Sequence, residues 1–378
     1  MKKNENPLSS FAGANENSTN ETAPRERVAN RRSFLKGVGM AGAALSAGAL
    51  LSTKAFATPK KSSSSLSSGD AAILRFLAAA ELIESDLWQQ YAELGGVTSG
   101  TQNNYQLALQ ALDGDGSQYI SSNTLDEISH ANFLNAYLIS KGAQPVNLDP
   151  FRTLPSSQAS GAKQIGRLTN LMQLTVDTSW YTRYRSQHNP DFGASFPQAV
   201  KLTGVTAIPR NDGDFGPSDH VQAIANTAAF HFGTIEQGGS SLYSAMAQKA
   251  QDVEVLRIVV SIGGDEVAHF LEWVDFAGNG VQAPIAPFTD PTNGLTFPDF
   301  NATGKKLLQT NLIFPIPCEF IDATLPHCAV IRPTEPAGIA AGAVRALTDD
   351  GLFIGQSQTF FNVLNGLAEA ADAAQRGF

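Results

Sequence analysis

Two stretches of the chain share the pattern Asp-Glu-x-x-His, at residues 126–130 and 265–269. Each lies inside an apolar run with helical periodicity, and a three-residue step on an α-helix turns by about 300°. The Glu and His of each stretch therefore project from one face of their helix. A carboxylate and an imidazole on the inward face of a bundle need a compensating partner, and a metal ion supplies one. The pattern predicts metal ligation by Glu127, His130, Glu266 and His269.

Glutamate is scarce in the middle of the chain, so few residues there are candidates for the remaining carboxylate ligands. Between residues 94 and 253 the sequence has only two Glu, which are Glu127 and Glu236. Glu236 lies on a long helical segment just before the second motif. We therefore predict that Glu236 is a further metal ligand.

On the first long helical segment, two carboxylates compete for the fourth carboxylate position. Glu81 and Glu84 both lie near the apolar face, about 60° apart around the helix axis. A faint internal repeat matches residues 82–91 with residues 234–243 and thereby pairs Glu84 with Glu236. The residues alone leave the choice between Glu81 and Glu84 open.

The complete ligand set is one Glu from each of two helices and a Glu-x-x-His pair from each of two others, as in dinuclear sites of four-helix bundles. Two divalent ions bring a charge of +4, which four Glu carboxylates neutralise. Two His leave coordination positions open for water, dioxygen or hydrogen peroxide. A set without Cys favours iron or manganese over structural zinc. We expect two Fe or two Mn ions, and dioxygen or hydrogen peroxide as the candidate small-molecule substrate.

Two further groups of residues have a predicted role and an open alternative. Tyrosine hydroxyls could donate hydrogen bonds to the ligand carboxylates, or the rings could be ordinary core aromatics: Tyr91, Tyr137 and Tyr243. The only two cysteines, Cys318 and Cys328, predict a short-loop disulfide in an oxidising compartment, with two free thiols as the alternative.

The helical periodicity predicts an all-α core without a useful period-2 run before residue 280. Long helices are expected over residues 70–94, 117–141, 219–251 and 253–277. A short helix is expected over residues 102–112 and another helical segment over residues 161–185. Together these elements predict a four-helix bundle over residues 70–280, with a long crossover at about 143–218.

The ends of the chain differ in character from the bundle. Residues 1–57 contain Arg31-Arg32, Phe34-Leu35-Lys36, a mild apolar run and Ala55-Phe56-Ala57, the features of a twin-arginine export signal. Residues 58–69 indicate a flexible linker. Residues 281–378 are rich in Pro and predict a loop-rich C-terminal extension with helices near 335–347 and 356–375.

The export signal and the charge define the expected compartment and partners. Residues 1–57 hold 8 of the 26 Lys and Arg and 4 of the 35 Asp and Glu, so the remainder carries 18 basic and 31 acidic residues, a net charge of −13. That charge argues against nucleic acid as a partner. We expect a periplasmic or secreted protein that meets the twin-arginine translocase during export. The apolar run in residues 1–57 is too short for a stable membrane span. The sequence leaves open whether the protein forms a homo-oligomer.

The chain resembles the ferritin-like superfamily, and more narrowly the secreted bacterial ferritin-like proteins grouped with plant desiccation-related proteins. The first helix resembles theirs through two Glu spaced three apart, Glu81 and Glu84, although Trp88 stands where that group usually has Tyr. The segment from Glu127 to His130, followed by Phe133-Leu134, resembles their second helix. The resemblance implies a four-helix bundle with a dinuclear metal site, favours Glu81 as the ligand, and implies no particular substrate.

Three functions remain open from the sequence. The first is a di-iron or di-manganese oxidoreductase that acts as a ferroxidase, a peroxidase or a catalase-like enzyme. The second is a non-enzymatic envelope or desiccation and stress-response protein whose metal is structural or absent. The third is a metal-free helical scaffold, which would have to pair six buried ionisable side chains among themselves.

Overall fold

The computed structural model describes residues 65–97, 103–183, 197–302, 317–328 and 335–376. The predicted export signal at residues 1–57 lies outside the described residues, as does most of the predicted linker. Among the described helices, none combines the length and the apolar character that a membrane crossing needs.

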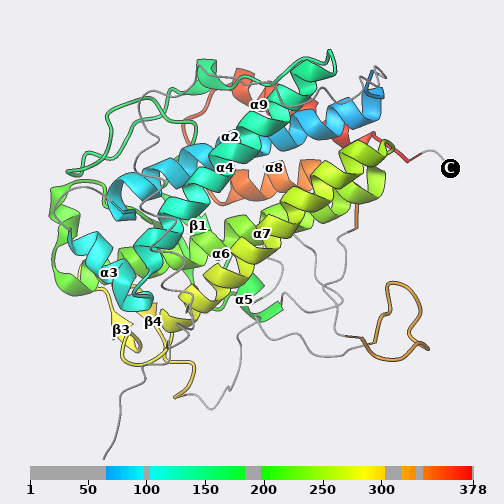
Figure 1. The fold of residues 1–378 in the computed structure, drawn as a ribbon. Helices are drawn as coiled ribbons and strands as arrows, with labels where there is room; N and C mark the ends of the chain where they lie inside the picture. Colours follow the sequence, from blue (N-terminus) through cyan, green and yellow to red (C-terminus); the bar gives the residue numbers. More distant parts are fainter. Residues whose placement is uncertain (1–64, 98–102, 184–196, 303–316, 329–334, 377–378) are drawn as a thin grey trace, which may run out of the picture. The chain divides into compact units, whose positions relative to one another are not determined.

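Four long helices form the bundle (Figure 1): α2 (Ser68–Gly95), α4 (Gly116–Ser140), α6 (Ser218–Lys249) and α7 (Val253–Asn279). Helix α2 packs against α4, and α6 packs against α7. Each helix begins and ends within two residues of the predicted bounds. The predicted all-α four-helix bundle is therefore confirmed.

The start of α2 is held by side-chain capping. The Ser67 hydroxyl accepts a hydrogen bond from the Asp70 backbone N–H at 3.0 Å, which satisfies a donor that has no partner within the helix. The Asp70 carboxylate in turn accepts from the backbone N–H groups of Gln251 and Asp252, at 2.9 and 3.2 Å. The first helix therefore begins inside the predicted linker and is tied to the turn between α6 and α7.

Buried aromatic rings join the two helix pairs. Trp88 of α2 stacks on Trp273 of α7 with ring centroids 5.3 Å apart. Phe232 of α6 packs against both, at 4.9 Å from Trp88 and 4.6 Å from Trp273. All three side chains are fully buried. Such rings bury a large apolar area and account for much of the packing between the pairs.

The connection between α2 and α4 contains α3 (Asn104–Leu112), close to the predicted short helix. Its start is a capping box: the Gln106 N–H donates to the Asn103 side chain at 2.8 Å, and the Asn103 N–H donates to the Gln106 side chain at 2.9 Å. Helix α3 packs against α6.

The predicted helical segment at residues 161–185 is wrong. Strand β1 (Leu174–Val176) pairs antiparallel with β2 (Leu202–Val205). Among the described residues of this segment, 161–183, the only helix is the short α5 (Trp180–Arg183). Two 3₁₀ turns, η1 (Asp149–Phe151) and η2 (Asp212–Phe215), complete the described crossover elements.

Asp86 of α2 explains why this segment is extended. The backbone N–H groups of Leu168 and Thr169 donate to Asp86 Oδ2 at 3.0 and 2.9 Å, so they cannot make helical hydrogen bonds. Arg152 donates to the other carboxylate oxygen at 2.6 Å and balances the buried charge. The leucines that suggested a helix are buried along an extended chain instead.

The C-terminal extension contributes β3 (Phe288–Thr289) and β4 (Thr296–Phe297), then α8 (Ile339–Asp349) and α9 (Gln358–Asp372). Helix α9 packs against α2 and α8, and α8 also contacts α6. Lys249 at the end of α6 donates to the Asp372 carbonyl at 2.7 Å. Residues 63–378 form one compact unit, so these helices belong with the bundle.

The predicted disulfide is not formed. Neither Cys318 nor Cys328 is in a disulfide; the first is buried and the second exposed.

Candidate metal centre

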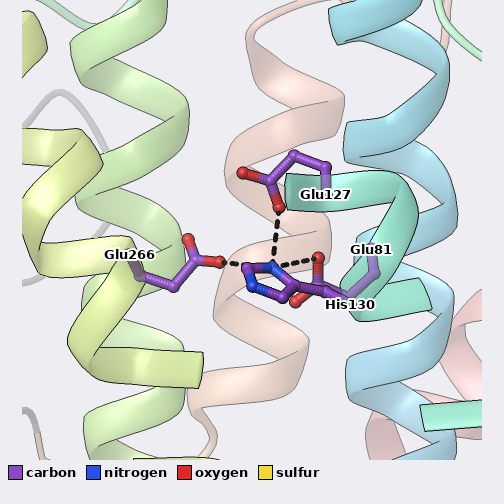
Figure 2. Close-up of side chains that lie close together, drawn as sticks. All are labelled: Glu81, Glu127, His130 and Glu266. Carbon is purple, nitrogen blue, oxygen red and sulfur yellow. Dashed lines mark hydrogen bonds and ion pairs between the residues drawn. The ribbon is translucent and has the colours of Figure 1, made fainter. Parts of the chain in front are cut away.

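Four side chains converge between α2, α4 and α7 (Figure 2). Glu81 comes from α2, Glu127 and His130 from α4, and Glu266 from α7, and each offers a ligand atom within 4.8 Å of the others. His130 Nδ1 lies 3.2 Å from Glu127 Oε2 and 3.5 Å from Glu81 Oε2. It lies 3.6 Å from Glu266 Oε1. The three carboxylates are at most 1% exposed, so water does not screen their charges.

A second group extends the cluster toward α6. Glu127, Glu236 and His269 offer ligand atoms that also lie within 4.8 Å of one another. His269 Nδ1 is 3.1 Å from Glu127 Oε1 and 3.4 Å from Glu236 Oε2. Glu127 thus belongs to both groups, with one carboxylate oxygen toward each His. Glu127 is therefore the residue that joins the two groups.

The structure distinguishes the two carboxylates of α2. Glu81 lies in the four-residue group, whereas Glu84 belongs to none of the groups of possible ligands among the described residues. Glu84 is half-buried and lines a cavity between α2 and α6. In the structure, the counterpart of Glu236 is therefore Glu81. The internal sequence repeat, which pairs Glu84 with Glu236, is shifted by three residues from this arrangement.

Buried polar atoms without a hydrogen-bond partner mark the centre of the cluster. Among the described residues they include Oε2 of Glu81, Oε2 of Glu236, both carboxylate oxygens of Glu266 and Nδ1 of His269. Leaving such groups unsatisfied costs about 1–3 kcal/mol each, and more for charged groups. All of these atoms are good ligands for a divalent ion. The residues present therefore fit a carboxylate- and imidazole-bound metal.

The imidazoles are oriented by aspartates of the opposite helix. His130 of α4 places Nε2 3.3 Å from Asp265 of α7, and His269 of α7 places Nε2 3.4 Å from Asp126 of α4. Both aspartates are about half-exposed, with side-chain exposures of 46% and 44%. A carboxylate on one ring nitrogen holds the other nitrogen toward a metal. The Asp in each Asp-Glu-x-x-His motif therefore serves the His of the other motif.

Asn123, one turn before Glu127, is a site residue that the sequence analysis missed. Its amide donates to Glu127 Oε1 at 2.6 Å and to Glu236 Oε1 at 3.2 Å. Its carbonyl accepts from the indole N–H of Trp273 at 2.7 Å. A buried Asn at a bundle position four residues before a candidate ligand is a sequence signal that could have found it.

The three tyrosines that were predicted to donate hydrogen bonds to the ligand carboxylates have different partners. The Tyr243 hydroxyl donates to Glu81 of the cluster. The Tyr91 hydroxyl instead pairs with His231 Nδ1 at 2.7 Å, away from the candidate ligands. The Tyr137 hydroxyl donates to Glu254 at 2.9 Å near the surface.

Crowding of buried carboxylates changes the acid–base behaviour of the cluster. Burial raises the pKa of Glu81 to about 7, although a hydrogen bond with His130 opposes the shift. Burial and the carboxylate of Glu127 raise the pKa of Glu266 well above its usual range. For His130, burial lowers the pKa, but hydrogen bonds with Asp265, Glu127 and Glu81 outweigh it and raise the pKa to about 12. The cluster therefore favours positive charge at its centre.

Glycines inside α6 and α7 let these helices approach the cluster closely. A Cβ at Gly239 would lie 2.0 Å from Glu266 Oε2, and a Cβ at Gly263 would lie 2.7 Å from Tyr243 Cβ. Glycine in a helix interior costs roughly 1 kcal/mol relative to alanine. The close approach explains why these two positions carry it.

Comparison with known families places the chain. Residues 69–273, more than half of the chain, match the family described as Ferritin-like domain, and the span includes all six converging Glu and His. No match was found among curated proteins or among solved structures. The four-helix bundle and the matched span agree, and the chain belongs to the ferritin-like domain family.

Proposed function

We propose that this protein binds a dinuclear iron or manganese centre and uses it to react with dioxygen or hydrogen peroxide. The observation that carries the proposal is the set of inward-facing, unpartnered polar atoms on Glu81, Glu236, Glu266 and His269. Six ionisable side chains at this burial are unfavourable without compensation. Two divalent ions would satisfy these atoms and balance the four carboxylates.

The geometry suggests how the residues divide between two ions. Glu81 and His130 serve one ion, and Glu236 and His269 serve the other. Glu127 belongs to both groups, and Glu266 extends into the first from α7. Such a centre, when bound, supplies redox chemistry with coordination positions left open for a small oxidant.

The surrounding residues would hold the ligands and manage protons. Asp126 and Asp265 fix the orientation of the imidazoles through Nε2. Tyr243 donates to Glu81, so this carboxylate keeps one orientation. Because the aspartates are about half-exposed, they also connect the buried imidazoles to solvent.

We further propose that the protein works outside the cytoplasm after export through the twin-arginine translocase. The support comes from the signal pattern in residues 1–57. This export route carries folded proteins, which suits a protein that acquires its metal before crossing the membrane. Cell fractionation of wild type and of an Arg31→Lys, Arg32→Lys variant tests this; equal export of both would contradict it.

Metal content is the decisive measurement for the centre. The purified protein, reconstituted anaerobically with ferrous or manganous ion, is expected to hold about two ions per chain by mass spectrometry. His130→Ala and His269→Ala should each lose about one ion, whereas His327→Ala, at an exposed position, should lose none. Equal metal content in all variants would overturn the ligand assignment.

A non-enzymatic role is the second candidate, and the burial of the cluster favours it. Carboxylates that are at most 1% exposed could hold a metal purely to stabilise the bundle. In that case metal removal would lower the melting temperature strongly while the metal-loaded protein leaves hydrogen peroxide unconsumed. Peroxide or dioxygen consumption above that of free metal ions would decide for the redox function.

A further inference from the structure

A cavity of about 230 Å³ lies between the bundle, the crossover strands and the C-terminal helices. We name it the lateral pocket. Its deep wall is apolar and buried, formed by Ile83 of α2, Leu242 of α6, and Val344 and Leu364 of the C-terminal helices. The bundle alone would leave this wall open to water. The crossover and the C-terminal helices therefore turn an exposed apolar surface into a pocket.

The rim of the lateral pocket is polar and exposed. Thr175, Lys201, Thr203 and Asp349 line the pocket and face solvent. The pocket therefore opens between the crossover strands and the end of α8. Buried apolar walls beneath a few polar groups are typical of sites for small molecules.

The inner end of the lateral pocket reaches the candidate metal centre. Gly239 lines the pocket, and a Cβ there would lie 2.0 Å from Glu266 Oε2. Gly239 therefore borders both the cavity and a carboxylate of the candidate centre. Glu84, which also lines the pocket, is one helical turn from Glu81.

The size and lining restrict the occupant. The volume of about 230 Å³ lies between the ~150 Å³ of an apolar cavity that takes benzene and the ~300 Å³ where ordinary ligand pockets begin. The occupant is thus a single-ring or short aliphatic molecule. A charged molecule would lose its hydration against the apolar part of the lining, and the carboxyl groups of Glu84, Asp177 and Asp350 beside it would repel an anion. We therefore expect an uncharged occupant.

We propose that the lateral pocket binds a small, uncharged, apolar molecule and presents it to the metal centre as an organic co-substrate. The presentation rests on the proposed function of the centre, whereas the binding itself does not. The proposal also assigns a purpose to the crossover strands and the C-terminal helices, which supply much of the pocket lining.

Nuclear magnetic resonance of hexan-1-ol with the manganese-loaded and the metal-free protein tests both parts. Binding to either form is followed by saturation transfer from the protein to the alcohol. Paramagnetic Mn²⁺ should additionally shorten the relaxation times of the alcohol protons, because the bound molecule lies close to the centre. Hexylammonium and hexanoate have the same chain length but carry a charge. Each should bind at least about tenfold more weakly than hexan-1-ol.

Two substitutions on α8 provide a matched pair. Ala346 lines the pocket and is half-buried, so Ala346→Phe should fill it and weaken hexan-1-ol binding by about tenfold or more. Ala341, on the same helix, is exposed and does not line the pocket, so Ala341→Phe should leave binding unchanged. Thr203→Trp at the exposed rim gives a second obstruction that leaves the core untouched.

The outcomes separate the two proposals. Binding that Ala346→Phe and Thr203→Trp weaken, with manganese-dependent relaxation, supports the inference. Binding without that relaxation in a protein that holds two manganese ions overturns the co-substrate role. Absence of binding in a protein with full metal content overturns the pocket assignment and leaves the metal centre intact. Absence of metal refutes the proposed function, and binding to the metal-free form still decides the pocket.

Discussion

The two helix pairs of the bundle supply equivalent ligands in the same order, but the residues around those ligands differ. Glu81 and Glu236 open each set, and the Glu-x-x-His motifs of α4 and α7 close it. Three residues after the first Glu, α2 has Glu84 whereas α6 has Gly239. The ligand positions are thus nearly symmetric, and the asymmetry begins one helical turn away.

The hydrogen bonds to the carboxylates show the same asymmetry. Four residues before its motif Glu, α4 has Asn123, which donates to Glu127, whereas α7 has the apolar Ile262. Glu127 is therefore held by a donor, and both oxygens of Glu266 lack one. Glu266, whose carboxylate lies beside Gly239 of the lateral pocket, is thus the ligand with the fewest protein hydrogen bonds. Two copies of one helix pair can thus provide a rigid side and an adaptable side.

The largest expected effect is a loss of metal on substitution of Gly239, which occupies the position in α6 that Glu84 occupies in α2. Gly239→Ala places a methyl group where the Glu266 carboxylate lies, and this flexible side chain must turn away. We expect the loss of about one metal ion of the two with little change in melting temperature, because the displaced atoms are at the end of a side chain. Glu84→Ala is the control and should retain full metal content. Metal content is measured by mass spectrometry, and an undiminished value for Gly239→Ala would contradict the tight fit.

The next effect concerns Asn123 and its counterpart Ile262. Asn123→Leu removes the donor to Glu127 and Glu236 and leaves the Trp273 indole N–H unpaired. Buried groups left without partners should lower the free energy of unfolding of the metal-free protein by roughly 3 kcal/mol. Ile262→Leu, a change of shape only, should cost less than about 1.5 kcal/mol. Urea unfolding of both variants measures the difference, and equal losses would refute the role of Asn123.

A third prediction concerns the pH dependence of stability that arises from the partner of Tyr91. Tyr91 pairs with His231, whereas Tyr243 pairs with a carboxylate of the cluster. Burial lowers the pKa of His231, the partner of Tyr91, from 6.5 to about 3. The unfolded chain therefore binds a proton below pH 6.5 that the folded protein excludes until about pH 3. This contribution to stability is complete above pH 6.5 and falls as the pH drops, by roughly 2 kcal/mol between pH 7 and pH 5.

His231→Gln removes the titrating ring and keeps an acceptor for the Tyr91 hydroxyl. The difference in unfolding free energy between wild type and this variant should shrink by that amount from pH 7 to pH 5. A difference independent of pH would show that the pKa of His231 is the same in the folded and the unfolded chain, which would contradict the predicted effect of burial.

The smallest expected effect is a difference in metal affinity between variants of Tyr243 and Tyr91. Tyr243→Phe removes the hydrogen bond to Glu81 and should weaken metal affinity about tenfold or more, as loss of such supporting contacts does. Tyr91→Phe removes a bond to His231, which lies outside the cluster, and should leave metal affinity unchanged. Competition with a chelator measures both affinities. If the two variants bind metal equally well, Tyr243 has no role in the centre.

Much of this architecture could be predicted from residue types and spacing. The four long helices followed from apolar periodicity, since each buries a broad face. The Glu and His that converge in the cluster stood out because such side chains are rare on apolar helix faces. These features depend on local sequence and on the exclusion of charge from a core.

Other features depend on partners that are distant in sequence. The segment at residues 161–185 has apolar spacing compatible with a helix, but Asp86 of α2 captures its backbone N–H groups. The register between Glu81 and Glu236 depends on how α2 and α6 face each other, which the apparent repeat misjudged. The Asp126–His269 and Asp265–His130 pairs cross between motifs, so neither motif alone predicts them.

The contact between α2 and α9 has a consequence for the order of folding. The first helix of the bundle packs against a helix that ends at Asp372, and Gly69 lies beside Ala374. During synthesis, α2 therefore leaves the ribosome about three hundred residues before the surface that covers it. The nascent chain must keep that apolar face shielded, by transient packing or by a chaperone, until α9 has been synthesised. The core of this domain is thus complete only after α9 has been synthesised and packs on α2.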